Sequence, residues 1–409
     1  MIAGRSSSYL LEHGLVGDRV EAGVLVQVSD GLITAVGGNP PEDPRRVSAL
    51  TMPTMANCHS HAFHRALRGH TQTERGSFWT WREQMYRLAG ELTPDSYHAL
   101  AVQVYAEMRA SGIGAVSEFH YLHHQPDGTP YDDPNEMGRA LLAAADEVGL
   151  RIRLLDTCYL ASGFGREPEG AQRRFSDGDA EAWAARVEAF ADDRVGAAIH
   201  SVRAVPREQL RTVADWAAGR PLHVHLSEQV AENEACLAAH GLTPTQLLAE
   251  EGVLGPMTSA VHATHLTATD VRLLGESGTY ACFCPTTERD LADGIGPSRE
   301  LVGAGSALTL GSDSHAVIDP FEEMRAVEMH ERLASQQRGH WSAAELLDAA
   351  TVTGHASLGF DDAGRIAVGQ QADFVTIDLD TWRTRGTGAT PETLVFAATA
   401  ADVAEVWRG

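Results

Sequence analysis

The sequence contains no lysine, so all 32 of its basic residues are arginine. This absence excludes chemistry that needs a lysine amine: Schiff-base formation, a pyridoxal phosphate linkage, a P-loop phosphate site or a carbamylated-lysine bridge between two metals. Long apolar runs are also missing, and none approaches the roughly 18 residues of a membrane-spanning helix. Because the first residues lack a basic stretch followed by an apolar one, we expect a cytoplasmic protein rather than an exported one.

Cysteine is scarce as well. The five cysteines are odd in number and scattered, which favours a reducing compartment over a disulfide framework. Cys282 and Cys284 lie in the apolar run TYACFC, where we expect packing rather than metal binding, and we expect the same of Cys58. A formal net charge of −24 argues against nucleic acid or an anionic membrane as partner. An anionic substrate would therefore need locally placed arginines.

Short apolar runs alternate with longer helix-like stretches between residues 53 and 315. Apolar strands separated by helices predict an α/β fold with a parallel sheet covered on both faces. Eight such units predict a (β/α)₈ TIM-like barrel, with an open doubly wound sheet as the alternative. The eight runs expected to form strands are TMPTMAN, GAVSEF, RIRLLDTCYL, VGAAIH, PLHVHL, SAVHAT, TYACFC and SALTLGSD.

The two ends of the chain differ from this pattern. Residues 1–52 contain VLVQVSDGLITAV, which is strand-like with a turn at Asp30-Gly31, and residues 359–409 contain the strand-like GRIAVGQQADFVTID. We expect these two segments to form a small composite β-sandwich domain, with residues 53–358 forming the barrel.

Histidine or acidic residues follow six of the eight predicted strands. The two histidines of H-S-H at 59–61 have the spacing that places side chains on one face of a strand. Catalytic groups of this barrel gather where the strands end, so the pattern predicts a metal site there. The polar residues at these ends are His59, His61, His120, Tyr121, His200, Arg203, His225, Glu228, His262 and Asp313.

Four motifs in this order resemble the amidohydrolase superfamily, in its mononuclear deaminase branch: H-S-H at 59–61, H-V-H-L-S-E at 223–228, H-A-T-H at 262–265 and G-S-D-S at 311–314. The resemblance covers nearly the whole chain and implies one zinc per chain, replaceable by iron or manganese. It also implies a homodimer. The implied metal ligands are His59, His61, His225 and Asp313. We expect His223 to be structural and His265 to be supporting or solvated.

The resemblance also implies three catalytic residues. Asp313, touching both metal and water, would accept a proton, and Glu228 would carry it to a nitrogen leaving group. His262 would polarise the attacked carbon's substituent or stabilise the tetrahedral intermediate.

The substrate is indicated by segments 76–87, 117–124, 160–175 and 200–205, which resemble those of formimidoylglutamate deiminases, enzymes of histidine degradation. The implied reaction converts N-formimino-L-glutamate to N-formyl-L-glutamate and ammonia. The implied substrate contacts are Arg82, Tyr121, His200, Arg203 and, where some members have glutamine, His64. The alternative is another mononuclear deaminase, acting on an aminopurine, a triazine or a different N-formimino amino acid.

The arginines support a small anionic, amino-acid-derived substrate independently of the resemblance. Guanidinium groups bind carboxylates bidentately, and a dicarboxylate in this acidic chain needs them. Arg82 alone could instead be a salt-bridge partner on a helix. The pairs Arg151/Arg153 and Arg173/Arg174 are expected on solvated faces.

Overall fold

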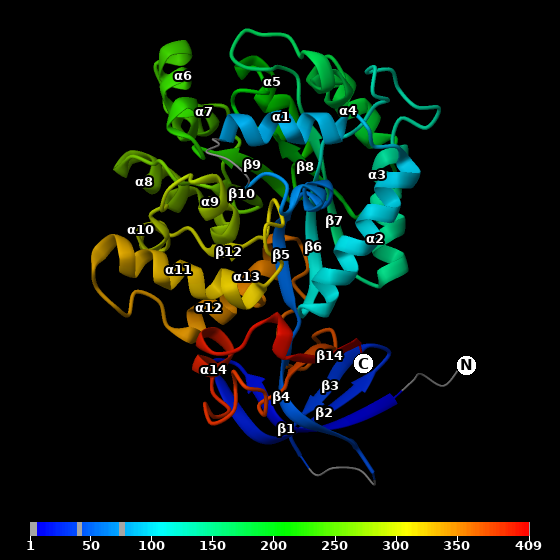
Figure 1. Ribbon diagram of the computed structural model, residues 1–409, viewed down its shortest axis with the longest axis vertical. Helices are drawn as coiled ribbons and strands as arrows, with labels where there is room; N and C mark the ends of the chain where they lie inside the picture. Colours follow the sequence, from blue (N-terminus) through cyan, green and yellow to red (C-terminus); the bar gives the residue numbers. More distant parts are fainter. Residues whose placement is uncertain (1–5, 39–42, 73–77, 409) are drawn as a thin grey trace. The chain divides into compact units, whose positions relative to one another are not determined.

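The computed structural model describes residues 6–38, 43–72 and 78–408, and its helices and strands are drawn in Figure 1. The chain divides into two compact units. One combines Met1–Asn57, Ala106–Ala115 and Ile318–Gly409, and the other combines Cys58–Tyr105 and Val116–Val317. Residues 1–5 of the predicted N-terminal segment, and residues 76–77 of the predicted substrate segment 76–87, lie outside the described residues. The domain boundaries at residues 53 and 358 stay a prediction.

A six-stranded sheet in the first unit joins the two ends of the chain, as predicted. Strand β4 pairs antiparallel with β13, with Pro53 opposite Phe374. The predicted turn at Asp30-Gly31 connects β2 and β3, and both residues have positive φ. The strand order is β14-β13-β4-β1-β2-β3. The strands are β1 (Ser6–Val16), β2 (Arg19–Ser29), β3 (Leu32–Val36), β4 (Arg45–Pro53), β13 (Asp373–Ile377) and β14 (Val403–Arg408).

Helices complete this unit. Three of them begin just after a residue whose side chain accepts from a backbone amide of the first turn: Asp319, Ser342 and Thr390. The helices are α11 (Pro320–Ser335), α12 (Ala343–Ala350), α13 (Val352–Ser357), α14 (Pro391–Phe396) and η3 (Ala400–Asp402).

The second sheet contains eight strands in chain order. Its two edges meet, because the amide of His61 donates to the carbonyl of Asp313 and the amide of Asp313 donates to the carbonyl of His59. The predicted (β/α)₈ barrel is therefore confirmed, and the open doubly wound sheet is wrong. The strands are β5 (Met55–Ser60), β6 (Ile113–His120), β7 (Arg151–Cys158), β8 (Val195–Ile199), β9 (Leu222–Leu226), β10 (Thr258–His262), β11 (Tyr280–Phe283) and β12 (Leu308–Leu310).

Helices lie outside these strands (Figure 1). The predicted end of one of them is confirmed, since α3 stops at Gly149, which has a φ of 73°. They are η1 (Ala62–Leu67), α1 (Phe78–Ala89), α2 (Pro94–Ala110), α3 (Glu136–Val148), η2 (Gly170–Phe175), α4 (Ala180–Glu188), α5 (Arg207–Trp216), α6 (Val230–His240), α7 (Pro244–Glu250), α8 (Ala268–Ser277), α9 (Pro285–Leu291) and α10 (Ser298–Ala304).

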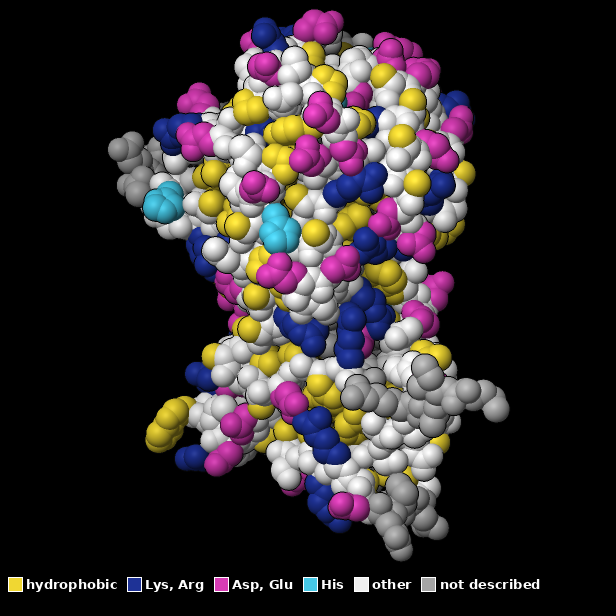
Figure 2. Space-filling view, turned by 90° about the vertical axis from the view of Figure 1, so that its right-hand side faces the viewer, with side chains coloured by type: hydrophobic (Ala, Val, Ile, Leu, Met, Phe, Trp, Pro, Cys, Tyr) yellow, Lys and Arg dark blue, Asp and Glu magenta, His cyan; other side chains and the backbone are white. Residues whose placement is uncertain are grey.

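Acidic and arginine side chains are interspersed over much of the face shown in Figure 2. Among the described residues, no helix combines the length and apolar character needed to cross a membrane.

Candidate active site

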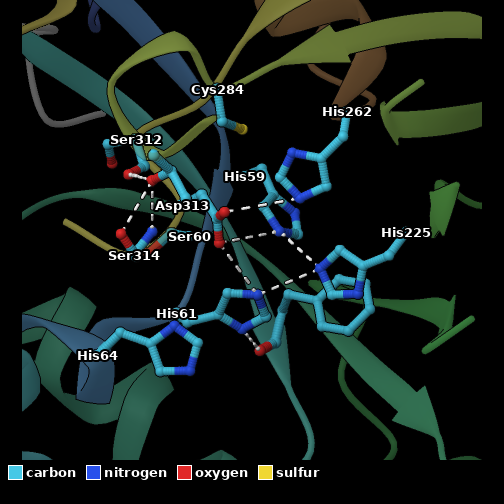
Figure 3. Close-up of polar contacts among 12 residues, drawn as sticks. His59, Ser60, His61, His64, His225, His262, Cys284, Ser312, Asp313 and Ser314 are labelled. Atoms are coloured by element: carbon cyan, nitrogen blue, oxygen red, sulfur yellow. Dashed lines mark hydrogen bonds and ion pairs between the residues drawn. The ribbon is translucent and has the colours of Figure 1, made fainter. Parts of the chain in front are cut away.

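Four buried side chains converge at one end of the barrel. His59 belongs to β5 and His61 follows it, while His225 belongs to β9 and Asp313 follows β12. The Nε2 atom of His225 lies 3.0 Å from Nε2 of His59 and 3.3 Å from Nε2 of His61. Oδ1 of Asp313 lies 3.5 Å and 3.4 Å from the same two nitrogens. Figure 3 shows the three rings and the carboxylate turned toward one another.

The hydrogen bonds of the rings indicate which nitrogen of each carries a proton. Nδ1 of His61 donates to the carbonyl of Phe119 at 3.0 Å, and Nδ1 of His225 donates to the carbonyl of His200 at 2.9 Å. Burial lowers the pKa of both imidazoles well below the usual value, which keeps them neutral. Each Nε2 then presents a lone pair to the centre. Clustered lone pairs beside a carboxylate fit a divalent metal, and nitrogen and oxygen donors of this kind suit zinc.

The G-S-D-S loop brings Asp313 close by using two unusual backbone positions. A Cβ atom on Gly311 would lie 2.7 Å from Cβ of His59, so only glycine allows this approach. Asp313 itself has a φ of 45°, in the left-handed region. This bend ends the alternation of the strand and turns the carboxylate toward the histidines.

The predicted proton-transfer residues lie beside this group. Nε2 of His262 is 3.8 Å from Oε1 of Glu228 and 3.6 Å from Oδ2 of Asp313. Burial raises the pKa of Glu228 to about 7. Burial would lower the pKa of His262, but Glu228, Glu288 and Asp313 outweigh it and raise that pKa well above the usual value. Burial also disfavours ionised Asp313, but its contact with His59 outweighs this effect and lowers the pKa of Asp313 to about 2.

All five predicted substrate residues line one cavity together with Glu228, His262 and Asp313. Nε2 of His64 lies 3.0 Å from the hydroxyl of Tyr121, and burial lowers the pKa of His64 to about 3. The guanidinium of Arg82 lies 5.4 Å from the ring centre of Tyr86. The residues brought together are His64, Arg82, Tyr121, His200 and Arg203.

Sequence reasoning missed a buried polar chain behind the first two histidines. The hydroxyl of Ser60 donates to Glu118 at 2.5 Å and lies 3.1 Å from Nε2 of His315. Nδ1 of His315 in turn lies 2.9 Å from the hydroxyl of Ser312. Ser60 separates His59 from His61, and Ser312 precedes Asp313, so this chain fixes the backbone that carries three of the four converging groups.

Two further glutamates were also missed. Oε1 of Glu288 lies 3.4 Å from Nδ1 of His262, on the side of the ring opposite Glu228. Oε1 of Glu232 accepts from Nε of Arg203 at 3.4 Å. Each lies on a helix that begins soon after its strand, and carboxylates are common at helix starts whatever their role, so the sequence alone does not single these two out. Both contact a side chain of the predicted site.

The expectation that Arg174 lies on a solvated face is wrong. Its side chain is fully buried and donates to the carbonyls of Ala89, Leu92 and His124. It therefore ties α1 to the loop after β6, and both carry residues of the cavity. The adjacent Arg173 is exposed, as predicted.

His120 follows the strand-end pattern but does not line the cavity. Its ring lies 5.0 Å from that of His123, and both rings are buried near Asp156. Asp156 accepts from both Nη atoms of Arg186, at 2.8 and 2.9 Å. This histidine cluster already contains its cation, so its role is structural. His223 is buried in β9, and Nε2 of the half-buried His265 lies 2.8 Å from the carbonyl of Asp293.

The sequence of the chain is similar to those of known proteins. The sequence model described as the amidohydrolase family matches residues 50–409. A formimidoylglutamate deiminase from Pseudomonas aeruginosa is 36% identical to the chain, over 91% of the chain and 86% of that relative.

Two solved structures share the fold over nearly the whole chain. An amidohydrolase from Brucella melitensis has a TM-score of 0.89 and 32% identity, with 98% of this chain and 93% of that one covered. An adenosine deaminase from Xanthomonas campestris, solved with bound zinc, has a TM-score of 0.82 and 25% identity, with 98% and 91% covered.

Proposed function

Because this chain belongs to the amidohydrolase family, we propose that it hydrolyses N-formimino-L-glutamate to N-formyl-L-glutamate and ammonia, a step of histidine degradation. Water adds to the formimino carbon, the bond from that carbon to the terminal nitrogen breaks, and the nitrogen leaves as ammonia. The main support is that Arg82 and Arg203 line the same cavity as Glu228 and His262. A dicarboxylate needs such a guanidinium pair, whereas a purine or triazine does not.

The metal proposed here is one zinc ion held by His59, His61, His225 and Asp313. The Nδ1 hydrogen bonds of His61 and His225 support this assignment, because they leave Nε2 as the donor atom. When bound, such a metal acts as a Lewis acid that makes water a nucleophile near neutral pH. The zinc in the Xanthomonas campestris adenosine deaminase supports the choice of metal, and iron or manganese are the other candidates.

Three residues of the chain would handle the protons. Asp313 accepts a proton from the attacking water, since its carboxylate is ionised at neutral pH. Glu228, with a pKa of about 7, transfers a proton to the terminal nitrogen and so lets ammonia leave. His262, charged among its carboxylate neighbours, stabilises the oxygen on the tetrahedral carbon by donating from Nε2.

The substrate's carboxylates would be bound by the two arginines of the cavity. Arg203 is aligned by Glu232, which contacts its Nε atom; the Nη atoms are not part of this contact. Arg82 approaches the same cavity from α1. His64 and Tyr121, in contact through Nε2 and the hydroxyl, add neutral hydrogen-bonding groups to the same cavity.

A second candidate is an aminopurine deaminase. It is favoured by the aromatic residues Trp81, Tyr86, Tyr121 and Tyr159 in the cavity wall, on which a base could stack. In that case neither Arg82 nor Arg203 would matter to turnover.

Ammonia release from a set of compounds tests the proposal. The metal-loaded protein is assayed with N-formimino-L-glutamate, N-formimino-L-aspartate, guanine, cytosine and adenosine. We expect N-formimino-L-glutamate to give the highest kcat/KM, by at least about tenfold, since each buried charged hydrogen bond contributes that much. A higher kcat/KM with any of the bases would overturn the assignment in favour of the second candidate.

A further inference from the structure

A second, larger cavity adjoins the candidate active site. The inner cavity, which contains Glu228 and His262, has a volume of about 50 Å³, and the outer one has a volume of about 520 Å³. Arg82 and Arg203 line both cavities. A molecule whose amidine group reaches Glu228 would therefore extend past these two guanidinium groups into the outer cavity.

The outer cavity lies between α6 and a tight turn after β7. The turn is closed by hydrogen bonds from Ser162 to the carbonyl of Arg166 and from Arg166 to the carbonyl of Gly163. Phe164, inside the turn, packs on His240 at the end of α6, with 5.5 Å between the ring centres. Besides Glu232, α6 contributes four alanines to the wall of this cavity: Ala231, Ala235, Ala238 and Ala239. The small alanine side chains leave space for a ligand in this cavity. The contact between Phe164 and His240 holds the turn against α6.

The charge of the outer cavity is opposite to that of the whole chain. Among the described residues that line it, three are arginines, Arg82, Arg166 and Arg203, and one is a carboxylate, Glu232, which already contacts Arg203. The chain as a whole carries a net charge of −24. A positive cavity in an acidic protein favours an anionic ligand and repels a cationic one.

We propose that the outer cavity binds a second amino-acid residue with a free carboxylate, so that the enzyme also deiminates N-formimino-L-glutamyl peptides of two residues. This inference rests on the proposed function and extends its substrate class. The second residue lies along the alanines of α6, and its terminal carboxylate pairs with Arg166. The reaction is unchanged: water adds to the formimino carbon, ammonia leaves, and an N-formyl dipeptide remains.

The test compares ammonia release from N-formimino-L-glutamate and N-formimino-L-glutamyl-L-glutamate by the metal-loaded full chain. We expect ammonia release from the dipeptide with a kcat/KM about tenfold below that for the shorter amidine, because the peptide bond replaces one of the two carboxylates that Arg82 and Arg203 bind. Release from the shorter amidine alone overturns this inference and leaves the proposed function standing. If neither compound releases ammonia, the proposed function fails, and this inference fails with it.

Two variants separate binding in the outer cavity from simple tolerance of a longer molecule. Arg166→Ala removes the terminal cation, and we expect kcat/KM for the dipeptide to fall about tenfold while the shorter amidine changes less than twofold. Ala235→Trp fills the cavity and should have the same selective effect. Arg338→Ala, which removes an equally exposed arginine elsewhere, is the matched control and should change neither substrate. Equal effects of Arg166→Ala on both amidines, or no effect on either, would contradict the inference.

Discussion

His59 and His225 are separated by 166 positions in the chain, yet their Nε2 atoms lie 3.0 Å apart. Two neutral imidazoles that meet in this way share either one proton or one cation. The second partner of His225 distinguishes these cases, because Nε2 of His61 is also within 3.3 Å and one proton cannot serve three nitrogens.

Metal content should therefore depend on these histidines. We expect about one zinc per chain in the purified protein. His225→Ala should reduce this to below about a tenth, because the remaining ligands no longer enclose the ion. Elemental analysis after dialysis measures the content, and His240→Ala on α6 serves as the control. Full metal retention by His225→Ala would contradict the assigned ligand set.

Glu228 should be needed for turnover but not for metal binding. Glu228→Gln keeps the shape of the side chain and removes its ability to carry a proton, so we expect kcat to fall by about 10²–10⁴-fold with unchanged metal content. The exposed Glu234 of α6 provides the matched control, Glu234→Gln, which should behave as wild type. An unchanged kcat in Glu228→Gln would rule out the proton-transfer role.

Arg203 should contribute to substrate affinity and depend on Glu232 for its position. Arg203→Ala should lower kcat/KM for N-formimino-L-glutamate. The loss of a charged hydrogen bond should cost about 1.5–3 kcal/mol of transition-state stabilisation. Glu232→Gln should have a smaller effect in the same direction, mainly on KM, because Nε of Arg203 would lose its charged acceptor. Normal kinetics of Arg203→Ala would show that no carboxylate binds there.

Arg186 should be important for stability rather than for activity. Its guanidinium pairs with Asp156 and Asp177, all three side chains being buried. Arg186→Met would leave two buried carboxylates without their guanidinium partner, and we expect the free energy of unfolding to fall by about 3–5 kcal/mol. The exposed pair Arg272–Glu276 offers a comparison, since Arg272→Ala should cost less than about 1 kcal/mol. Urea unfolding measures both, and equal losses would contradict the assignment.

Acid should weaken the contacts of Asp402. Burial disfavours its ionised form, but hydrogen bonds from Arg383, Thr381 and Thr399 outweigh this and lower its pKa to about 2, from an ordinary value of 3.8. A lowered pKa in the folded state means that the stabilisation is complete above pH 3.8 and is lost as the pH falls toward 2. Allowing for the partly exposed Arg383, the loss is about 1–2 kcal/mol.

The matching measurement is urea unfolding between pH 4.5 and 2.5. Wild type should lose more stability over this range than Asp402→Asn, which cannot titrate at this position. Parallel curves for the two proteins would show that Asp402 contributes nothing to the acid sensitivity.

Much of the site could be predicted because strand ends mark one edge of a barrel. His59, His225 and Asp313 follow different strands, and the closure of the sheet brings those ends together whatever their separation in the chain. The positions of the motifs at strand ends were therefore enough to predict that these residues and the substrate-contact candidates lie close together. Their roles, and the homodimer, stay predictions.

The rest depends on which way a side chain turns, which spacing alone does not determine. His262 and Asp313 have φ values of 69° and 45°, so simple alternation fails at these strand ends. Glu118 lies within β6, where a buried carboxylate needs partners, and these are supplied by Ser60 of β5 and by the amide of Ala62 just after it. Arg174 resembled a solvated arginine because its three carbonyl acceptors lie on other segments.

The identity of the products tests the account most directly. N-formimino-L-glutamate labelled with ¹³C at the formimino carbon is incubated with the metal-loaded protein and followed by NMR. The label should appear in N-formyl-L-glutamate, with one ammonia released for each molecule formed. Label in formamide together with free glutamate, or no conversion by a protein that holds its zinc, would contradict it.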